Sequence, residues 1–498
     1  MENAERIPVI IGIGQVNDRP ETLEAALDPV GLMTEALRRA DADAGGGWLP
    51  ALDAISVVEQ IGWPDLDNIS GRVAAALSVA PRIAEQTPQP TGDSPVRLLH
   101  DAANRIGAGE IRLAAVVGAE ALRTAAQRAA ASPSGVHNTS RKLSESRSKT
   151  SYRGRYGLIA PVDVYPLYEN AGRAAYGQTL AEAQAESGLI WSLFSEVAAA
   201  NPSAWIRKAV SAEEILTPSP SNRPIAFPYN KLMVANSSVN QGAGFLVCSL
   251  AFARERGVPD ERVVYVGKGV AGHECDNPLE RDRFDRSPSM GVSIGRCMEL
   301  NGLTVDDLDA VELYSCFPCV PKMARRVLGW PADRPATVFG GLTFGGGPIG
   351  NYMSHAVCCM VERLRGEART GLLFANGGFA TENHTIVLTR TPQPAGTFPQ
   401  DYDFKAEADA ARGPAPELAE EYEGPGTIET YTVLYARDGA PLHGVIVARN
   451  PEGARFLAKV PPEDEATIAF LTDGAAEPVG AAGSAARGAD DLMVWSRG

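Results

Sequence analysis

The strongest constraint on the fold is a set of short motifs that occurs twice, in the same order and at nearly one spacing. The recurring motifs are Asp53-Ala54-Ile55 with Asp309-Ala310-Val311, Gly109-Glu110 with Gly366-Glu367, and Gly12 with Gly267. The members of these pairs lie 256, 257 and 255 residues apart. Any α/β protein offers occasional pairs of this kind, but agreement in both order and spacing indicates an internal duplication of a strand–helix–strand unit.

Hydrophobic periodicity predicts the same element order in both copies. The expected strands are 8–14, 53–58 and 113–118 in the first copy and 262–267, 309–313 and 371–375 in the second. The expected helices are 29–40 and 96–106 in the first copy and 291–301 and 355–365 in the second. Strands that alternate with helices in this way are typical of an α/β fold.

The duplication and the changes in composition divide the chain into four parts. We predict an N-terminal half at 1–250, which includes an inserted region at 120–235, and a C-terminal half at 251–395. A linker rich in Pro, Ala and acidic residues follows at 396–424. The last part, 425–498, contains short alternating segments that predict a small all-β domain.

The net charge of −15 disfavours nucleic acid and anionic membranes as partners. Against this background the tract from Ser132 to Gly157 is basic, which is typical of either a solvated loop or a phosphate contact. The charged N-terminus is no signal peptide, and no apolar run reaches membrane-spanning length. Seven cysteines without disulfide spacing then predict a cytoplasmic protein with reduced thiols.

Three side chains suited to acyl transfer follow apolar strands or glycine-rich turns. Cys316 follows a short apolar strand, His355 lies beyond the glycine cluster 340–348, and His384 lies beyond the turn 375–378. Acyl transfer from a thioester requires a thiolate, a base and donors for the oxyanion. We therefore consider Cys316 as nucleophile, His355 as base, and His384 as oxyanion donor or second acid.

Each of these residues also has a plainer interpretation. A cysteine after a strand is commonly a small core residue, and a histidine near a helix start can simply cap the helix. The string Cys316-Phe317-Pro318-Cys319 also fits a redox pair or half of a zinc site, although no second Cys/His pair has metal-ligand spacing.

Longer segments match motifs of one superfamily. They are Ser94 to Glu120, Met233 to Ala243, Gly340 to Gly350 and Gly371 to Gly378. In order, these are similar to the segment after the thiolase nucleophile, the stretch that contacts the pantetheine arm of coenzyme A, the thiolase glycine loop and the last catalytic turn. Glu312 to Phe317 also resembles the His-Asp-Cys-Phe motif of sterol-carrier-protein thiolases.

The chain thus resembles the thiolase superfamily over residues 7–392, and most closely the thiolase-like proteins type 1, which carry an added C-terminal β domain. The resemblance implies an α/β duplicated thiolase fold, with two βαβαβαββ halves in five αβαβα layers and a small OB-like all-β domain. It implies coenzyme A or acetyl-CoA as a substrate, with no permanently bound cofactor and no metal. It leaves a homodimer as a possible assembly.

The sequence departs from the thiolases at their catalytic positions. The position of the acylated cysteine falls near Gly92, that of the Gly-His-Pro histidine on Gly347, and that of the second cysteine near Ala375. The resemblance therefore implies a fold and a coenzyme A connection more firmly than it implies a reaction.

Two functions remain open from the sequence. The first is a coenzyme A-dependent acyltransferase that acts on a β-keto acyl substrate or acyl-CoA through a cysteine acyl-enzyme at Cys316. The alternative is a catalytically degenerate protein that binds coenzyme A or acyl-CoA without thiolase activity. In both cases, the residues that the resemblance assigns to coenzyme A binding are Ser237, Gly346, Gly347, Asn376 and Gly378.

Overall fold

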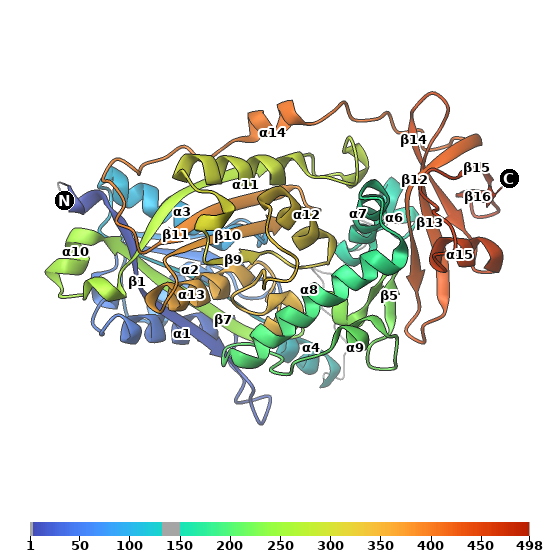
Figure 1. The fold of residues 1–498 in the computed structure, drawn as a ribbon. Coiled ribbons are helices and arrows are strands. Elements are labelled where there is room, and N and C mark those ends of the chain that lie inside the picture. Colours follow the sequence, from blue (N-terminus) through green and yellow to red (C-terminus); the bar gives the residue numbers. More distant parts are fainter. Residues whose placement is uncertain (1–2, 132–149, 498) are drawn as a thin grey trace.

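Two similar halves, an inserted helical region and a terminal β-barrel make up the protein (Figure 1). The computed structural model describes residues 3–131 and 150–497. Most of the predicted basic tract, 132–149, lies outside the described residues. At its end, Arg153 donates hydrogen bonds to the carbonyl oxygens of Leu158 and Ile159, and Arg155 pairs with Glu420, so both side chains bind other parts of the chain.

The first half supplies five strands and four helices to the core. Its strands are β1 (Pro8–Asn17), β2 (Ala54–Val58), β3 (Ile83–Gln86), β4 (Leu113–Ala121) and β7 (Asn240–Ser249). Its helices are α1 (Pro29–Asp43), α2 (Ile69–Ala76), α3 (Ser94–Ala108) and α10 (Leu250–Glu255). Helix α1 begins with Pro29 directly after the N-cap Asp28, whose carboxylate accepts the N–H of Gly31, a common helix start.

The second half repeats this order. Its strands are β8 (Val264–His273), β9 (Ala310–Leu313), β10 (Thr370–Gly377) and β11 (Glu382–Thr389). Its helices are α11 (Pro288–Asn301), α12 (Cys319–Leu328) and α13 (Tyr352–Arg365). The strands of both halves form one sheet in the order β3-β2-β4-β7-β1-β8-β11-β10-β9, in which the halves meet through a short β1–β8 pairing.

The duplication is confirmed by matching contacts in the two halves. The Asp53 carboxylate accepts the backbone N–H groups of Arg112 and Leu113 at 2.7 and 3.1 Å. In the second half, the Asp309 carboxylate accepts those of Arg369 and Thr370 at 2.7 and 3.0 Å. In both halves, the repeated aspartate thus binds the start of the parallel strand that lies beside its own.

The helices arrange the sheet into the layers that were expected. Helix α3 contacts both β4 and β11, and α13 contacts both β7 and β10, so these two helices lie between the two halves of the sheet. Helices α1 and α2 cover the outer face of the first half, and α11 covers that of the second. Alternate residues of β1 accordingly enter different cores, Ile10 the central one and Val9 the outer one.

The inserted region carries helices and two short strands. These elements are α4 (Leu122–Ala131), α6 (Tyr152–Arg155), α7 (Pro161–Ala175), α8 (Leu180–Ala200), α9 (Ala212–Leu216), β5 (Pro224–Ala226) and β6 (Tyr229–Asn230). Figure 1 shows this region between the core and the terminal barrel. After the second half, the predicted linker contains α14 (Lys405–Ala411), which packs on α11 and β8.

The C-terminal part is a closed five-stranded barrel. It consists of β12 (Gly424–Tyr435), β13 (Pro441–Arg449), β14 (Arg455–Val460), α15 (Glu465–Thr472), β15 (Ala482–Arg487) and β16 (Met493–Arg497). Strand β12 pairs with both β13 and β15, which closes the barrel, and its end also pairs with β5 of the inserted region. Among the residues that the structure describes, no helix has the length and apolarity needed to cross a membrane.

Candidate active site

Loops from both halves and the inserted region converge around Cys316. The N–H of Tyr314 donates to the Phe374 carbonyl at 3.1 Å, which joins the loop after β9 to β10. The N–H of Leu342 donates to the Ser315 hydroxyl at 3.3 Å, which joins the glycine loop to the same place. The N–H of Ala235 donates to the Cys316 carbonyl at 3.1 Å, so the segment that contains Ser237 joins them as well.

Cys316 itself is buried against aromatic side chains. Cys316 lies in the loop after β9, two residues beyond Tyr314. The ring of the next residue, Phe317, stacks on those of Tyr165 and Tyr229, with centroid distances of 4.6 and 5.9 Å. Burial raises the pKa of the Cys316 thiol to about 12, although a hydrogen bond with Tyr165 opposes this shift. At neutral pH the group is therefore a thiol and not the thiolate that acyl transfer requires.

The hydrogen bonds of the two predicted histidines go to other side chains than Cys316. His355 Nδ1 lies 2.8 Å from Gln15 Oε1, and its ring stacks on Phe339 at 4.8 Å. His384 Nε2 lies 3.1 Å from His100 Nδ1. Among the described residues, His355 Nε2 and His384 Nδ1 have no hydrogen-bond partner. No hydrogen bond joins Cys316 to either imidazole, so the predicted nucleophile–base arrangement is not assembled.

The reason lies in the elements that carry the imidazoles. His355 lies in the first turns of α13, on a helix that packs between the sheet halves, and it faces Gln15 of β1. His384 lies within β11, on the face that meets His100 of α3. Burial lowers the pKa of His355 to about 3 and that of His384 well below its usual value, so both rings are neutral.

Gly92 lies near the point where the resemblance places the acylated cysteine of the thiolases, and the surrounding atoms leave no room for a side chain there. A Cβ atom on Gly92 would lie 1.9 Å from the carbonyl oxygen of Asn376 and 2.7 Å from the hydroxyl oxygen of Tyr314. Both distances are far below van der Waals contact. A cysteine is therefore excluded at this position by the way in which the loops pack around it.

Tyr314 is a functional candidate that the sequence interpretation did not include. Its side chain is 8% exposed, and its hydroxyl oxygen lies 2.7 Å from the point that a Cβ atom on Gly92 would occupy. Burial raises the pKa of this phenol well above 10, so it is a neutral donor. The available signal was its place in the Glu312–Phe317 string, where it replaces the first residue of the His-Asp-Cys-Phe motif.

A pair of carboxyl groups lies beside Gly92. Asp93 is buried and accepts a hydrogen bond from the Thr91 hydroxyl at 2.6 Å, and Glu382 Oε2 is buried with no hydrogen-bond partner in the part of the chain that the structure describes. A Cβ atom on Gly377 would lie 2.8 Å from Glu382 Oε2 and 3.4 Å from Asp93 Oδ1, so both oxygens adjoin the same point. Burial and then the charge of Asp93 raise the pKa of Glu382 to about 7.

The residues assigned to coenzyme A binding fall into two groups. Ser237 is exposed, and the Gly347 N–H donates to the Asn236 carbonyl at 2.8 Å, so these two loops adjoin. Gly346 has a φ of +105°, and a Cβ atom there would lie 2.1 Å from Gln241 Oε1, so this position requires glycine.

Asn376 and Gly378 form the second group and are bound to the protein itself. The Tyr165 hydroxyl lies 3.0 Å from Asn376 Oδ1 and 3.2 Å from the Gly378 carbonyl oxygen, and Asn376 donates to Asn383 at 2.9 Å. The Asn376 side chain is therefore satisfied without a ligand. Among the described residues, no group of three or more His, Cys, Asp or Glu side chains is arranged to hold a metal ion.

Comparisons with known proteins agree with this architecture. A family model described as the thiolase-like protein type 1 additional C-terminal domain matches residues 407–487. The crystal structure of a monomeric SCP2-thiolase-like protein type 1 from Mycobacterium smegmatis is 31% identical, with a TM-score of 0.83 over 99% of this chain and 100% of that one. The chain belongs to the thiolase-like protein type 1 family.

Other solved structures share the fold of this thiolase-like protein at lower identity. Human mitochondrial 3-ketoacyl-CoA thiolase is 12% identical, with a TM-score of 0.59 over 78% of this chain and 100% of that one. The Ltp2–ChsH2(DUF35) aldolase is 19% identical, with a TM-score of 0.58 over 78% and 98%. A search of curated protein sequences finds no match.

Proposed function

We propose that this thiolase-like protein binds an acyl-CoA thioester and acts on it by acid–base chemistry, without the cysteine acyl-enzyme of the thiolases. The observation that carries the proposal is the packing at Gly92, where the Tyr314 hydroxyl and the Asn376 carbonyl occupy the space of a nucleophilic side chain. The Cys316 thiol, protonated and without a bonded imidazole, is a poor substitute for that nucleophile.

The available groups suit cleavage of a carbon–carbon bond next to the thioester. In a β-hydroxyacyl thioester, a carboxylate of the Asp93–Glu382 pair takes the hydroxyl proton, and the Cα–Cβ bond breaks to release an aldehyde or ketone. The electron pair moves onto the thioester as an enolate, and a proton then returns to Cα. The neutral Tyr314 hydroxyl is a donor for the oxygen on which this negative charge develops.

The fold comparison is compatible with this reaction class. One protein of the same fold, the Ltp2–ChsH2(DUF35) assembly, is described as an aldolase. A retro-aldol step needs no thiolate and no external oxidant. It therefore uses what this site retains and does not require the three thiolase groups that the chain lacks.

Acyl transfer through Cys316 is the second candidate. Its support is the hydrogen bond of the thiol with Tyr165 and the contact of the Cys316 backbone with the segment that carries Ser237. This enzyme would move an acyl group between coenzyme A and a β-keto partner through a thioester on Cys316. The two candidates differ in whether the protein itself becomes acylated.

Intact mass spectrometry separates the two candidates. The wild type, Cys316→Ala and Tyr314→Phe would be incubated with acetyl-CoA, longer acyl-CoAs and β-hydroxyacyl-CoAs, with Cys358→Ala as the control for loss of a buried thiol elsewhere. We expect acyl-CoA binding without an adduct, and release of a carbonyl product that falls roughly 100-fold or more in Tyr314→Phe. An acyl adduct that disappears only in Cys316→Ala would reject the proposal in favour of acyl transfer.

A further inference from the structure

The turn Gly377–Thr381, which adjoins Gly92 and the carboxyl pair, is held by side chains from outside its own strands. The Tyr165 hydroxyl accepts the Ala380 N–H at 3.0 Å. The Tyr168 hydroxyl donates to the Phe379 carbonyl at 2.8 Å, and Arg281 Nη1 donates to the Ala380 carbonyl at 3.2 Å. The position of the turn thus depends on helix α7, which carries both tyrosines, and on the segment that carries Arg281.

Arg281 is a buried charge with a fixed partner. Its side chain and that of Glu274 are 1% and 3% exposed and pair at 3.1 Å. The guanidinium also lies over the Tyr168 ring, 5.1 Å from the centroid, and its Nε has no hydrogen-bond partner within residues 3–131 and 150–497. A buried ion pair of this kind is costly to separate, so the guanidinium moves only when its backbone segment moves.

The C-terminal barrel binds that backbone segment directly. Arg455 on β14 is fully buried, and its Nη1 donates to the Leu279 carbonyl and, at 2.7 Å, to the Arg281 carbonyl. Glu429 on β12 holds the same guanidinium at 2.6 Å. Arg455 thus fastens the segment that carries Arg281 to two strands of the barrel.

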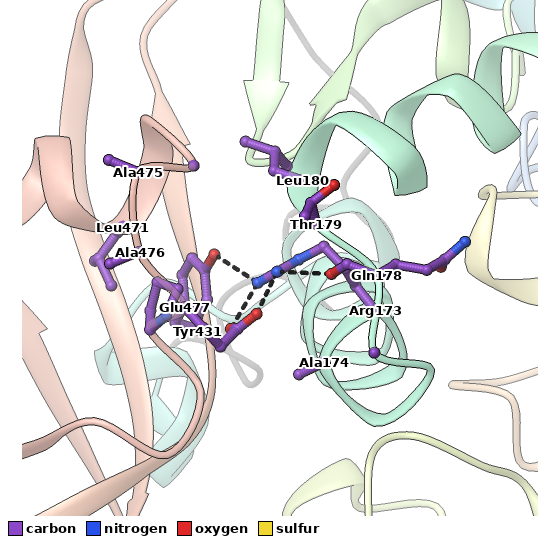
Figure 2. Close-up of a pocket in the computed structure, with 13 residues that line it drawn as sticks. Arg173, Ala174, Gln178, Thr179, Leu180, Tyr431, Leu471, Ala475, Ala476 and Glu477 are labelled. Atoms are coloured by element: carbon purple, nitrogen blue, oxygen red, sulfur yellow. Dashed lines mark hydrogen bonds and ion pairs between the residues drawn. The ribbon is translucent and has the colours of Figure 1, made fainter.

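The barrel also binds the helix that carries the two tyrosines. The Thr430 hydroxyl donates to the Leu167 carbonyl at 2.6 Å, and Asn170 Nδ2 donates to the Tyr431 carbonyl at 2.9 Å. Figure 2 shows the third contact, in which Arg173 of α7 binds Glu477 and the Tyr431 hydroxyl. These three residues line a cleft of about 370 Å³. Both supports of the turn therefore rest on the barrel.

We propose that the C-terminal barrel positions the Gly377–Thr381 turn, with Arg455 as a positioning residue that acts through Arg281. The turn in this position keeps the Asn376 carbonyl over Gly92 and holds the start of β11, which carries Glu382. The proposal deepens the proposed function, on which its ligand rests, because it gives the barrel a role at the acyl-CoA site.

Hydrogen–deuterium exchange of the full-length protein tests this coupling without any ligand. The variants are Arg455→Gln, Arg455→Lys and, as the control, Ile446→Val, which loosens the core of the barrel itself. We expect Arg455→Gln to raise exchange in 377–382 roughly threefold to tenfold, and Arg455→Lys to raise it less. The dissociation constant of acyl-CoA should rise by a similar factor, whereas Ile446→Val should leave both quantities unchanged.

The outcomes separate this inference from the proposed function. Exchange in 377–382 that is the same in Arg455→Gln and Ile446→Val would overturn the positioning role, whether or not acyl-CoA binds. Faster exchange in a protein whose wild type binds no acyl-CoA would support positioning and reject the proposed function. If Arg455→Gln does not fold, Arg455→Lys decides in the same way, because a lysine keeps the charge but lacks the fork that reaches two carbonyls and Glu429.

Discussion

The two halves of the core are alike where strands begin and different where their central helices begin. Asp53 and Asp309 make the same pair of backbone contacts in each half. At the start of α3, in contrast, a Cβ atom on Gly92 would lie 1.9 Å from the Asn376 carbonyl oxygen, whereas before α13 a Cβ atom on Gly347 would come no closer than 3.3 Å to its nearest neighbour. The two halves thus share the backbone contacts at their strand starts and differ in the packing before their central helices.

The largest expected effect tests this difference with one substitution in each half. Gly92→Ala places a methyl group against the Asn376 carbonyl and should lower the free energy of unfolding by about 3 kcal/mol. Gly347→Ala, whose nearest neighbour would be the Asn236 carbonyl at 3.3 Å, should cost less than about 1 kcal/mol. Urea unfolding of both variants measures the two costs, and equal costs would contradict the comparison.

A second test compares the first residues of two strands, β7 in the first half and β11 in the second. Strand β7 begins with Asn240, whose amide bonds Thr124, whereas β11 begins with Glu382, whose pKa is raised to about 7. A carboxyl group that holds its proton more tightly when folded destabilises the protein as pH rises from its unfolded value near 4.5 through about 7.

The wild type should therefore lose stability between pH 5 and 8, with no further loss from this group at higher pH. Partial exposure reduces the penalty to about 1–2 kcal/mol. Glu382→Gln should remove the decline and leave stability near pH 4 almost unchanged, as followed by the urea midpoint at each pH. An unaltered pH profile in Glu382→Gln would show that another group titrates.

The smallest expected effect concerns the hydrogen bonds that Asp53 and Asp309 accept from the backbone in the two halves. Asp53→Ala and Asp309→Ala each remove two hydrogen bonds to backbone N–H groups near the surface, so each should lower stability by about 1 kcal/mol. Chemical unfolding of the single variants and the double variant measures both costs and their sum. Costs that differ severalfold between the halves would mean that these contacts are similar in geometry only.

Much of the fold could be predicted because duplication leaves a spacing that survives substitution. Two local signals were enough to predict these parts of the fold. The Asp53 and Asp309 motifs predicted the two halves, and the alternating pattern that starts β12 predicted the terminal β domain. The site could be predicted only in part. The strings around Cys316 and Gly347 were brought to adjoining loops, but no local pattern states which side of α13 carries His355 or which face of β11 carries His384.

Contacts between distant loops could not be predicted from the sequence, because no local pattern encodes them. The approach of the Asn376 carbonyl to Gly92 depends on how the two halves pack, and neither neighbourhood contains a sign of it. Arg455 likewise reads as an ordinary charged residue at the start of a strand. Its burial against the Arg281 segment appears only when the barrel is docked.

The pairing of β5 with β12 has a consequence for the order in which the chain can fold. Ala226 in the inserted region pairs with Leu434 of the barrel, and the Phe227 N–H donates to the Val433 carbonyl at 2.8 Å. During synthesis the inserted region leaves the ribosome well before β12 is translated. The edge of β5 that pairs with β12 therefore stays unpaired while the second half is made. A segment that is translated later thus completes a region made much earlier, and a chain that stops before residue 424 would present that edge to chaperones and proteases.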